Sequence, residues 1–374
     1  MRVLLALAQL PVTEGGAAGR CAVGLLRGLR GHGLDVVAVA ALHPSQDTFS
    51  RPAAEDDVEL VRVPASADWG ARLGRFTRPR GQLSRTAFAE RVREVASTCD
   101  VLHLEEVETA WCDVGIERPS VVHLQYLARL DAPWGAPWSP RFRFNAEATA
   151  AELAAARRHR HLIANSPRMA DELRRLAPRA EVVVVPLTLD PADYRPASLQ
   201  GPPVAGVIGT ATWAATGLAT RRLVEEIWPR VRRELPEATL QVAGRGMTDL
   251  VTSSRTMGVE IVGEVDSASA FLRGLSLLVF PIDRGSGMKV KVLEALASGV
   301  PVVTTPAGAE GFEGVAGIAV ESTEEGLARS VVELLRDEGA RRQLGEQARQ
   351  AFLERYSPVP AVEPAVELYR RMLG

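Results

Sequence analysis

Short runs of β-branched and other apolar residues alternate with amphipathic stretches over almost the whole chain. Apolar runs of this length are typical of buried strands, and apolar positions that recur every three or four residues are typical of helices. In the first half, strands are expected at 3–8, 35–41, 58–63, 101–104, 121–125, 162–165 and 182–185, and helices near 20–30, 86–97, 145–158 and 168–176. Regular alternation of strand and helix predicts a parallel sheet with right-handed crossovers.

The second half repeats this pattern after a break. Its expected strands are 204–208, 239–243, 259–262, 277–281, 301–304 and 318–320, and its helices lie near 220–234, 267–272, 289–297, 324–336 and 341–355. The break, from Val185 to Pro203, is rich in proline and is typical of an interdomain connection. After Pro358, apolar residues recur at helical spacing up to Leu373, so a terminal helix with one covered face is expected. We therefore predict two open α/β domains, with ligands bound in a cleft beyond the carboxyl ends of their strands.

Composition narrows the function. The 374 residues carry a formal net charge of -2, and 46% are hydrophobic, as in an ordinary globular protein of two domains. The near-neutral balance disfavours a nucleic-acid partner, which needs clustered positive charge. No apolar run approaches the ~20 residues that span a bilayer. We therefore expect no transmembrane segment. Cys21, Cys99 and Cys112 lack the spacing of metal ligands, and we expect a reduced, cytoplasmic protein.

The lysines are unusually placed. Of 44 basic residues only Lys289 and Lys291 are lysines, and they stand one residue apart. A bias toward arginine can come from genome composition, so the pairing matters more than the shortage. The pair lies in the segment 283–295, which follows a predicted strand, contains two glycines and Arg284, and opens a helix. Helix-start amides and cations together suit a diphosphate, and Glu294 nearby suits a sugar hydroxyl. A solvated helix face with a Lys–Glu ion pair is the alternative.

A second glycine-rich turn, residues 13–20, joins the first strand to the first helix. Gly15 and Gly16 allow a ligand to approach the backbone closely, and the helix start offers N–H groups to phosphate. A tight turn without a ligand is the alternative. The Gly-x-Gly-x-x-Gly fingerprint of dinucleotide sites is absent from the turn, so an NAD-dependent dehydrogenase has little support.

Two histidines end predicted strands in the first half. His103 stands beside the acidic residues Glu105 and Glu106, and His123 stands two residues before Gln125, on the same face of its strand. A histidine acts as a base near neutral pH, and a neighbouring carboxylate raises its pKa. The alternative for each is a strand-end histidine whose ring is satisfied by a backbone carbonyl.

Tryptophan, proline and arginine concentrate in a predicted loop at residues 131–144. Aromatic faces such as those of Trp134 and Trp138 stack on sugars, and arginine binds phosphate. The loop is therefore a candidate acceptor site, or a peripheral contact with a membrane that carries a lipid-linked acceptor. A loop packed over its own domain by these aromatic residues is the alternative.

These motifs together resemble one family. Residues 289–303, Lys-x-Lys-Val-Leu-Glu-Ala-Leu-Ala-Ser-Gly-Val-Pro-Val-Val, are similar to the donor-site segment of glycosyltransferase family 4. Gly15-Gly16 resembles the family's opening, 185–196 its interdomain linker, and 258–263 followed by Val265 the strand that meets the nucleotide base. The resemblance covers nearly the whole chain. It implies the GT-B fold, an α/β fold of two Rossmann-like domains that face each other across a cleft, with a C-terminal helix that crosses back to the first.

The resemblance implies a division of labour. Residues 1–190 would form the acceptor-side domain, 201–357 the nucleotide-sugar donor domain, and 358–374 the helix that packs back on the first domain. The reaction would be retaining transfer of a sugar from a nucleotide diphosphate donor, a UDP-sugar favoured, without an obligatory metal or other cofactor. The acceptor would be a small molecule, a natural product, or an envelope or lipid-linked glycan.

Family roles carry over by position. The diphosphate would be bound by Gly15, Gly16, Arg284, Gly287, Met288 and Lys289, the ribose by Glu294, and the base near Gly263 and Val265. Family members often carry a pair of cations after the first donor-domain strand, but residues 213–217 contain none. In this chain the positive charge of the missing pair would come from Lys289, Lys291 and Arg284 instead.

Two further departures concern the chemistry. The first of two family glutamates eight residues apart falls at Ser286, which together with Asp283 would lie against the transferred sugar. The usual strand-end histidine is replaced by Gln125, which leaves His123, His103 and Gln125 as the candidate catalytic residues. Two alternatives to an ordinary glycosyltransferase therefore stay open. One is a pseudo-glycosyltransferase with a nitrogen or sulfur nucleophile, and the other is a non-catalytic nucleotide-sugar-binding protein.

Overall fold

The computed structural model describes residues 1–374 except 14, 45–56, 65–77, 132–134, 201–202 and 252–256. The chain divides into two compact units. Unit 1 comprises Met1–Asp190 together with Ser357–Gly374, and unit 2 comprises Pro191–Tyr356. Among the described residues, no helix is both long enough and apolar enough to cross a bilayer.

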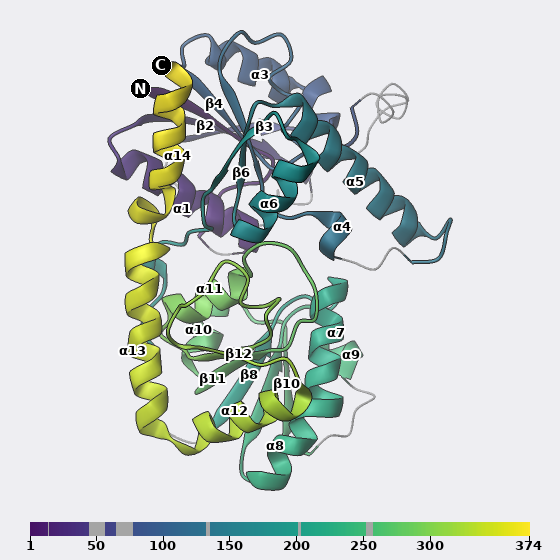
Figure 1. Cartoon of the computed structure of the whole chain (residues 1–374), viewed down its shortest axis with the longest axis vertical. Coiled ribbons are helices and arrows are strands. Elements are labelled where there is room, and N and C mark those ends of the chain that lie inside the picture. Colours follow the sequence, from purple (N-terminus) through teal and green to yellow (C-terminus); the bar gives the residue numbers. More distant parts are fainter. Residues whose placement is uncertain (14, 45–56, 65–77, 132–134, 201–202, 252–256) are drawn as a thin grey trace. The chain divides into compact units, whose positions relative to one another are not determined.

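Unit 1 is built on a seven-stranded parallel sheet (Figure 1). Its strands are β1 (Arg2–Leu7), β2 (Asp35–Leu42), β3 (Val58–Arg62), β4 (Val101–Glu105), β5 (Ser120–Leu124), β6 (His161–Ala164) and β7 (Glu181–Val184). Across the sheet they run in the order β3-β2-β1-β4-β5-β6-β7. Because the order reverses between β1 and β4, the loops that follow these two strands diverge, and such a switch point is the usual ligand site of an open α/β sheet.

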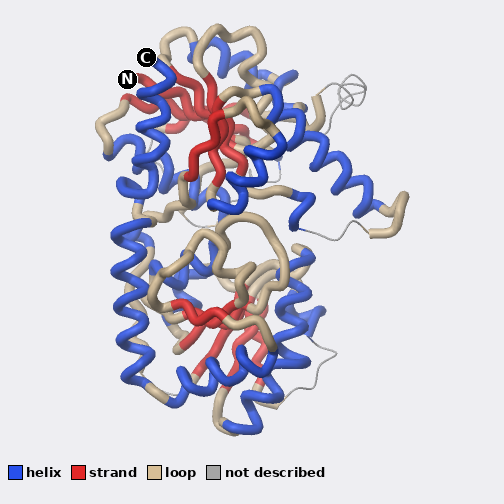
Figure 2. Tube along the Cα trace, viewed as in Figure 1, coloured by secondary structure: helices blue, strands red, loops and turns tan. Residues whose placement is uncertain are grey.

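Helices cover both faces of this sheet (Figure 2). Successive side chains of a strand point to opposite faces, so Leu4 enters the core on one side and Leu5 the core on the other. The first core is closed by α3 (Ala87–Ala96), α5 (Pro140–Arg158) and α6 (Pro167–Leu176), and the second by α1 (Ala17–Gly31) and α14 (Pro358–Leu373). Short helical turns at Gln82–Arg85 and α4 (Ala128–Asp131) complete the unit.

The terminal helix α14 packs on α1, which confirms the predicted helix that returns to the first domain. A Cβ at Gly28 would lie 2.3 Å from the carbonyl oxygen of Pro358, so glycine is what allows the two helices to approach this closely. Val362, Val366 and Tyr369 are buried in the core between these helices and the sheet. The apolar stripe is shorter than the sequence predicted, because Leu373 is 47% exposed.

Unit 2 is built on a six-stranded parallel sheet with the strand order β10-β9-β8-β11-β12-β13. The strands are β8 (Val204–Ile208), β9 (Thr239–Ala243), β10 (Val259–Gly263), β11 (Leu277–Phe280), β12 (Val302–Thr304) and β13 (Ile318–Val320). The helices are α7 (Ala214–Arg222), α8 (Trp228–Glu234), α9 (Met247–Val251), α10 (Ala268–Arg273), α11 (Val290–Ala297), α12 (Glu324–Arg336) and α13 (Glu338–Arg355). Its switch point lies between β8 and β11, so ligands are expected at the loops after these strands.

The helix predicted at 220–234 is longer than expected. Helix α7, a π-helical turn (Leu223–Ile227) and α8 follow one another without a break from residue 214 to residue 234. The π-helical turn ends two residues before Pro229, which lacks the N–H group that a regular α-helix would require there. Trp228, the first residue of α8, is fully buried.

The prediction of a loop at residues 131–144 is wrong in its last part. Pro140–Phe144 form the first turn of α5, because Ser139 accepts a hydrogen bond from the N–H of Phe142 at 3.1 Å and Pro140 stands where a helix needs no donor. At the other end, Asp131 closes α4. The Ser-Pro helix start was the signal that the aromatic composition concealed.

Candidate functional site

In unit 2, residues 281–289 form a loop between β11 and α11 at the switch point of the sheet. Gly285 and Gly287 have φ angles of 147° and 69°, which L side chains rarely adopt. These turns bring the chain to the start of α11, whose first N–H groups therefore lie at the loop. Six predicted site residues lie in this loop. Asp283 and Arg284 are exposed, Lys289 is half-buried, and the buried ones are Ser286, Gly287 and Met288.

Lys289 holds this loop in shape. It is the N-cap residue of α11, and its Nζ donates to the carbonyl oxygen of Gly287 and to that of Ser286, the latter at 3.4 Å. An ammonium group that joins two carbonyls of its own loop stabilises the turn. Direct binding of diphosphate by Lys289 stays a prediction of the sequence.

Lys291 points elsewhere, to the turn that follows β8. Its Nζ donates to Oγ1 of Thr216 at 3.0 Å and lies 4.4 Å from the centroid of the Phe280 ring. A Cβ at Gly209 would come within 2.6 Å of this Nζ, so the missing side chain leaves the space that the ammonium occupies. Burial lowers the pKa of Lys291 to about 8, although Glu294 opposes the shift. The structure thus brings a cation from α11 to the turn whose own sequence has none.

Two buried carboxylates lie beside the lysines. Glu294, on α11, is 3% exposed and accepts the O–H of Tyr194 at 3.0 Å. Glu310 is 4% exposed and accepts the N–H of Gly287 at 2.8 Å. The Gly287 amide therefore has a protein partner in this structure, and its contact with a diphosphate stays a prediction. Neither Tyr194 nor Glu310 was identified from the sequence, because no local pattern relates them to the loop.

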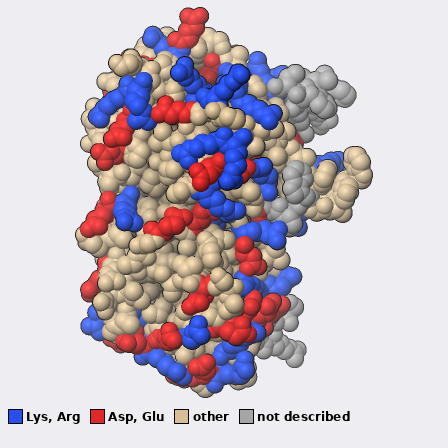
Figure 3. Space-filling model, in the orientation of Figure 1, with Lys and Arg blue, Asp and Glu red and all other residues tan. Residues whose placement is uncertain are grey.

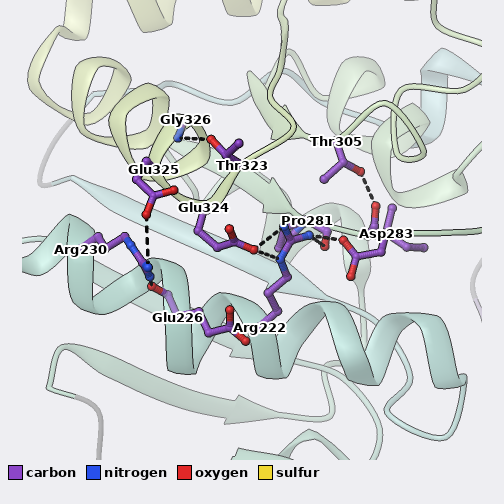
Figure 4. Close-up of polar contacts among 11 residues, drawn as sticks. Arg222, Glu226, Arg230, Pro281, Asp283, Thr305, Thr323, Glu324, Glu325 and Gly326 are labelled. Atoms are coloured by element: carbon purple, nitrogen blue, oxygen red, sulfur yellow. Dashed lines mark hydrogen bonds and ion pairs between the residues drawn. The ribbon is translucent and has the colours of Figure 1, made fainter.

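Arg222 supports the same loop from α7 (Figure 4). Its guanidinium donates to Oε1 of Glu324 at 3.0 and 2.7 Å, to the carbonyl oxygen of Pro281 at 3.3 Å, and to the carboxylate of Asp283. A planar group with several donors suits this task, since it joins three acceptors from two segments. Asp283, predicted to contact the sugar, is thus held by an arginine that the sequence analysis did not identify.

The residues predicted to lie near the base end β10. Gly263 has a φ angle of 78°, and its carbonyl oxygen accepts the N–H of Gly244 at 2.6 Å. Val265 follows in the next turn and is half-buried. Both residues stand at the carboxyl edge of the sheet, on the side of β8 opposite β11. Their role in base binding stays a prediction.

In unit 1, Gly15 and Gly16 form the turn before α1. Gly15 has a φ angle of 114°, and Gly16 is the N-cap residue of the helix without a side-chain cap. A Cβ on Gly16 would meet none of the described atoms within 4 Å, whereas one on Gly19 would lie 2.6 Å from the carbonyl oxygen of Leu10. Gly19 is therefore required for packing, and Gly16 leaves the start of α1 open to a ligand.

The candidate catalytic residues of unit 1 converge on Glu105. Nε2 of His103 lies 2.9 Å and Nδ1 of His123 lies 3.1 Å from Oε2 of Glu105, and Nε2 of Gln125 donates to Oε1 at 2.5 Å. Parallel pairing of β4 with β5 sets Glu105 opposite His123, and both point to the face covered by α14. On this face, the hydroxyl of Tyr369 of α14 is hydrogen-bonded to Nδ1 of His103. The partner of each histidine is thus a carboxylate, and not the backbone carbonyl of the alternative interpretation.

This group also has the composition of a cation site. Ligand atoms of His103, Glu105 and His123 lie within 4.8 Å of one another, and all three side chains are buried. The hydrogen bonds among them already account for their arrangement. The prediction that the reaction needs no metal is left untested by this geometry.

Further acidic residues follow β4 directly. Glu106 has a φ angle of 70°, and burial together with Glu108 and Glu105 raises the pKa of its carboxyl to about 8. The guanidinium of Arg80 lies 3.4 Å from Glu108 and donates to the hydroxyl of Tyr126 at 3.0 Å. The carboxyl edge of the unit 1 sheet is therefore polar, and part of its charge is neutralised at pH 7.

The predicted acceptor loop is described only in part. Trp134 lies outside the described residues. Trp138 is 85% exposed and has a φ angle of 69°, so its ring does not pack over the domain. Phe144, on the first turn of α5, lies under the guanidinium of Arg80 at 4.7 Å. For Trp138, the alternative of a loop packed by its own aromatic residues is wrong.

Charge of both signs is interspersed on the face shown in Figure 3, in agreement with a net charge of -2.

A hollow of about 740 Å³ lies at the amino ends of β6 and β7, lined by residues 156–160 and 175–180. It contains none of the predicted site residues and lies at the edge of the sheet opposite to them.

Comparison with known proteins decides the family. Residues 16–188 match the model of a glycosyl transferase 4-like domain, and residues 202–337 match the model of glycosyl transferases group 1. The chain is a GT-B glycosyltransferase of the family 4 type. The two models fall on the two units in the predicted order, which confirms the family and the class of enzyme. No curated protein sequence matches the chain.

Solved structures share the fold over the full length. Sucrose-phosphate synthase from Thermosynechococcus elongatus is 15% identical, with a TM-score of 0.72, over 100% of this chain and 99% of that one. HepE from Anabaena in complex with UDP and glucose is 16% identical, with a TM-score of 0.68, over 98% and 99%. TarM of S. aureus is 9% identical, with a TM-score of 0.72, over 98% and 98%. This likeness confirms the GT-B fold class.

Proposed function

We propose that this glycosyltransferase transfers a sugar, with retention of configuration, from a UDP-sugar to a hydroxyl-bearing acceptor. The observation that carries the proposal is the loop before α11, where a helix start, Lys291 and the buried carboxylate of Glu294 come together. Helix-start amides and an ammonium group suit a diphosphate, and a carboxylate suits a pair of ribose hydroxyls. The complexes of HepE with UDP and with UDP-glucose support the choice of base.

In this proposal Lys291 is the cation that meets the departing diphosphate. Its low pKa reflects a site with little solvent, where a negative partner would restore the charged form. The positive charge and the N-terminus of α11 would stabilise the leaving group as the bond to the sugar breaks. Lys289 and Arg222 would hold the loop in the conformation that this requires. No metal has a part in these steps.

The acceptor is assigned to unit 1. The carboxyl edge of its sheet presents Gln125, His123 and Glu106, which can bind and orient hydroxyl groups. The exposed ring of Trp138 supports a glycan or a lipid-linked glycan as the acceptor, because an aromatic face can stack on a sugar ring. A membrane-bound acceptor would be reached from the cytoplasm.

Donor screening tests the proposal directly. Thermal shift and calorimetry with UDP, GDP, dTDP and their sugars should give a specific rise in Tm with uridine nucleotides. Proton NMR of the transfer product should show the anomeric configuration of the donor sugar. Binding confined to another base would contradict the donor assignment, and an inverted product would contradict retention.

A second function is kept open by Ser286, which is buried at the position of the first family glutamate. Without that carboxylate the sugar end of the site changes, and a pseudo-glycosyltransferase with a nitrogen or sulfur nucleophile becomes the alternative. Product mass and linkage distinguish it from O-transfer. Tight donor binding, with neither hydrolysis nor transfer to any acceptor, would indicate a non-catalytic nucleotide-sugar-binding protein.

A further inference from the structure

A buried chain of polar groups runs from the C-terminal helix to the end of β5 in unit 1. The hydroxyl of Tyr369 of α14 is hydrogen-bonded to Nδ1 of His103, whose Nε2 lies 2.9 Å from Oε2 of Glu105. The same carboxylate oxygen lies 3.1 Å from Nδ1 of His123. All four side chains are more than nine-tenths buried. Such a network has few ways to distribute its protons.

The charge of Glu105 decides where those protons lie. Burial alone would raise the pKa of Glu105, but His123 and the hydrogen bonds from both imidazoles hold it well below its ordinary value, so the group is a carboxylate that only accepts. Each ring nitrogen that faces it must therefore carry a hydrogen. Burial lowers the pKa of His103, so its ring is neutral and Nδ1 accepts the O–H of Tyr369, whose own pKa is raised by burial and by Glu105.

One atom of the network is left without a partner. Nε2 of His123 is buried and has no hydrogen-bond partner among the described residues. Because Nδ1 of the same ring donates to Glu105, a neutral His123 presents a lone pair at Nε2. A buried acceptor without a donor is uncommon in folded proteins, and here the rest of the network is complete. Among the described residues, Nε2 of His123 is therefore the acceptor of this network that still lacks a donor.

We propose that Tyr369 and His103 are positioning residues for Glu105, which holds His123 in the Nδ1–H tautomer so that Nε2 accepts a hydroxyl of the sugar substrate or acceptor. The inference rests on the proposed function, since that reaction supplies the hydroxyl. Gln125 completes the arrangement by donating to the second oxygen of Glu105. The last helix of the chain thereby takes part in the site of unit 1, although Tyr369 lies 266 residues from His103.

The tautomers can be read without activity. In protein labelled with ¹⁵N-histidine, we expect the ring of His123 to be protonated at Nδ1 and that of His103 at Nε2. Glu105→Gln should give His123 a mixture of tautomers, because an amide both donates and accepts. Tyr369→Phe should change the spectrum of His103, whereas Tyr356→Phe, which removes a hydroxyl bonded to Gly311 in unit 2, should not. His123 protonated at Nε2 in the wild type, or a His103 spectrum unchanged in Tyr369→Phe, would overturn the proposal.

Kinetic measurements test whether sugar transfer depends on the network of Glu105 and His123. Glu105→Gln should lower kcat of transfer roughly tenfold or more, with the KM for donor little changed, because the lost function is orientation of one base or acceptor. Tyr369→Phe should lower kcat less, and Tyr356→Phe not at all. Unaltered kcat in Glu105→Gln, with the spectra as expected, would refute the catalytic half of the inference. If the wild type transfers no sugar, the proposed function fails while the spectra still report the tautomers.

Discussion

Replacement of Lys291 by methionine separates stability from donor binding. The ammonium of Lys291 is held in a poorly solvated place by one hydroxyl and one aromatic ring, and burial lowers its pKa from 10.5 to about 8. The folded protein therefore binds this proton less readily than the unfolded chain does. Methionine keeps the unbranched shape and removes the charge, so Lys291→Met should unfold at a higher denaturant concentration than the wild type at pH 7.

The structure gives the size of the effect. The difference between the two pKa values corresponds to about 3 kcal/mol of lost stability at neutral pH, at ~1.36 kcal/mol per pKa unit. The variant also loses the contact with the Phe280 ring and the hydrogen bond to Thr216, together about 1 to 2 kcal/mol. The net gain in the free energy of unfolding is about 1 to 2 kcal/mol. Loss of charge-assisted bonds to the diphosphate should at the same time weaken donor binding by roughly 10- to 100-fold.

Urea denaturation at a series of pH values checks the reasoning. Between about pH 8 and pH 10.5 the unfolded wild-type chain holds the Lys291 proton and the folded protein does not, so stability rises with pH in this window and is insensitive to Lys291 below it. The advantage of Lys291→Met over the wild type should therefore shrink across this window and change sign near its upper end, where the wild type no longer carries the penalty but still has the contacts of Lys291. Lys289→Met is the matched control, because its ammonium is bonded to carbonyl oxygens of its own loop. A variant that is less stable at pH 7, with an unchanged pH profile, would refute the account of Lys291.

Two further substitutions test the supports of the sites. Arg222→Leu should raise the KM for the nucleotide sugar several-fold and lower the free energy of unfolding by about 1 to 2 kcal/mol, since it leaves Glu324 and the β11–α11 loop without their hydrogen-bond donor. The control is Arg230→Leu, which should change the free energy of unfolding by less than about 0.5 kcal/mol in the same denaturation assay, because its partner Glu325 is 71% exposed. Gly28→Ala should destabilise unit 1 by about 2 kcal/mol, because its Cβ would meet the Pro358 carbonyl at 2.3 Å, and a Tm equal to wild type would contradict the close approach of α1 and α14.

The sequence predicted the elements well where two local signals agreed. The helix at 324–336 matches the structure residue for residue, because a capping threonine precedes an apolar stripe of helical period. The strands at 204–208 and 239–243 also match, since polar turn residues on both sides of a short apolar run define where the strand begins and ends. The signals conflicted at 131–144, where tryptophan and proline suggested a loop although Ser139 and Pro140 begin a helix.

The sequence alone determined the fold class, the family resemblance, the glycine turns and the segments that carry the candidate site, because strand period, helix period and turn chemistry act over a few neighbouring residues. Only the tertiary structure decided which lysine faces the turn after β8, that Arg222 and Glu310 hold the loop before α11, and that Tyr369 completes the network of Glu105. These partners lie from 23 to 266 residues apart along the chain. Their meeting depends on the register of parallel strands and on helix packing, which local sequence does not encode.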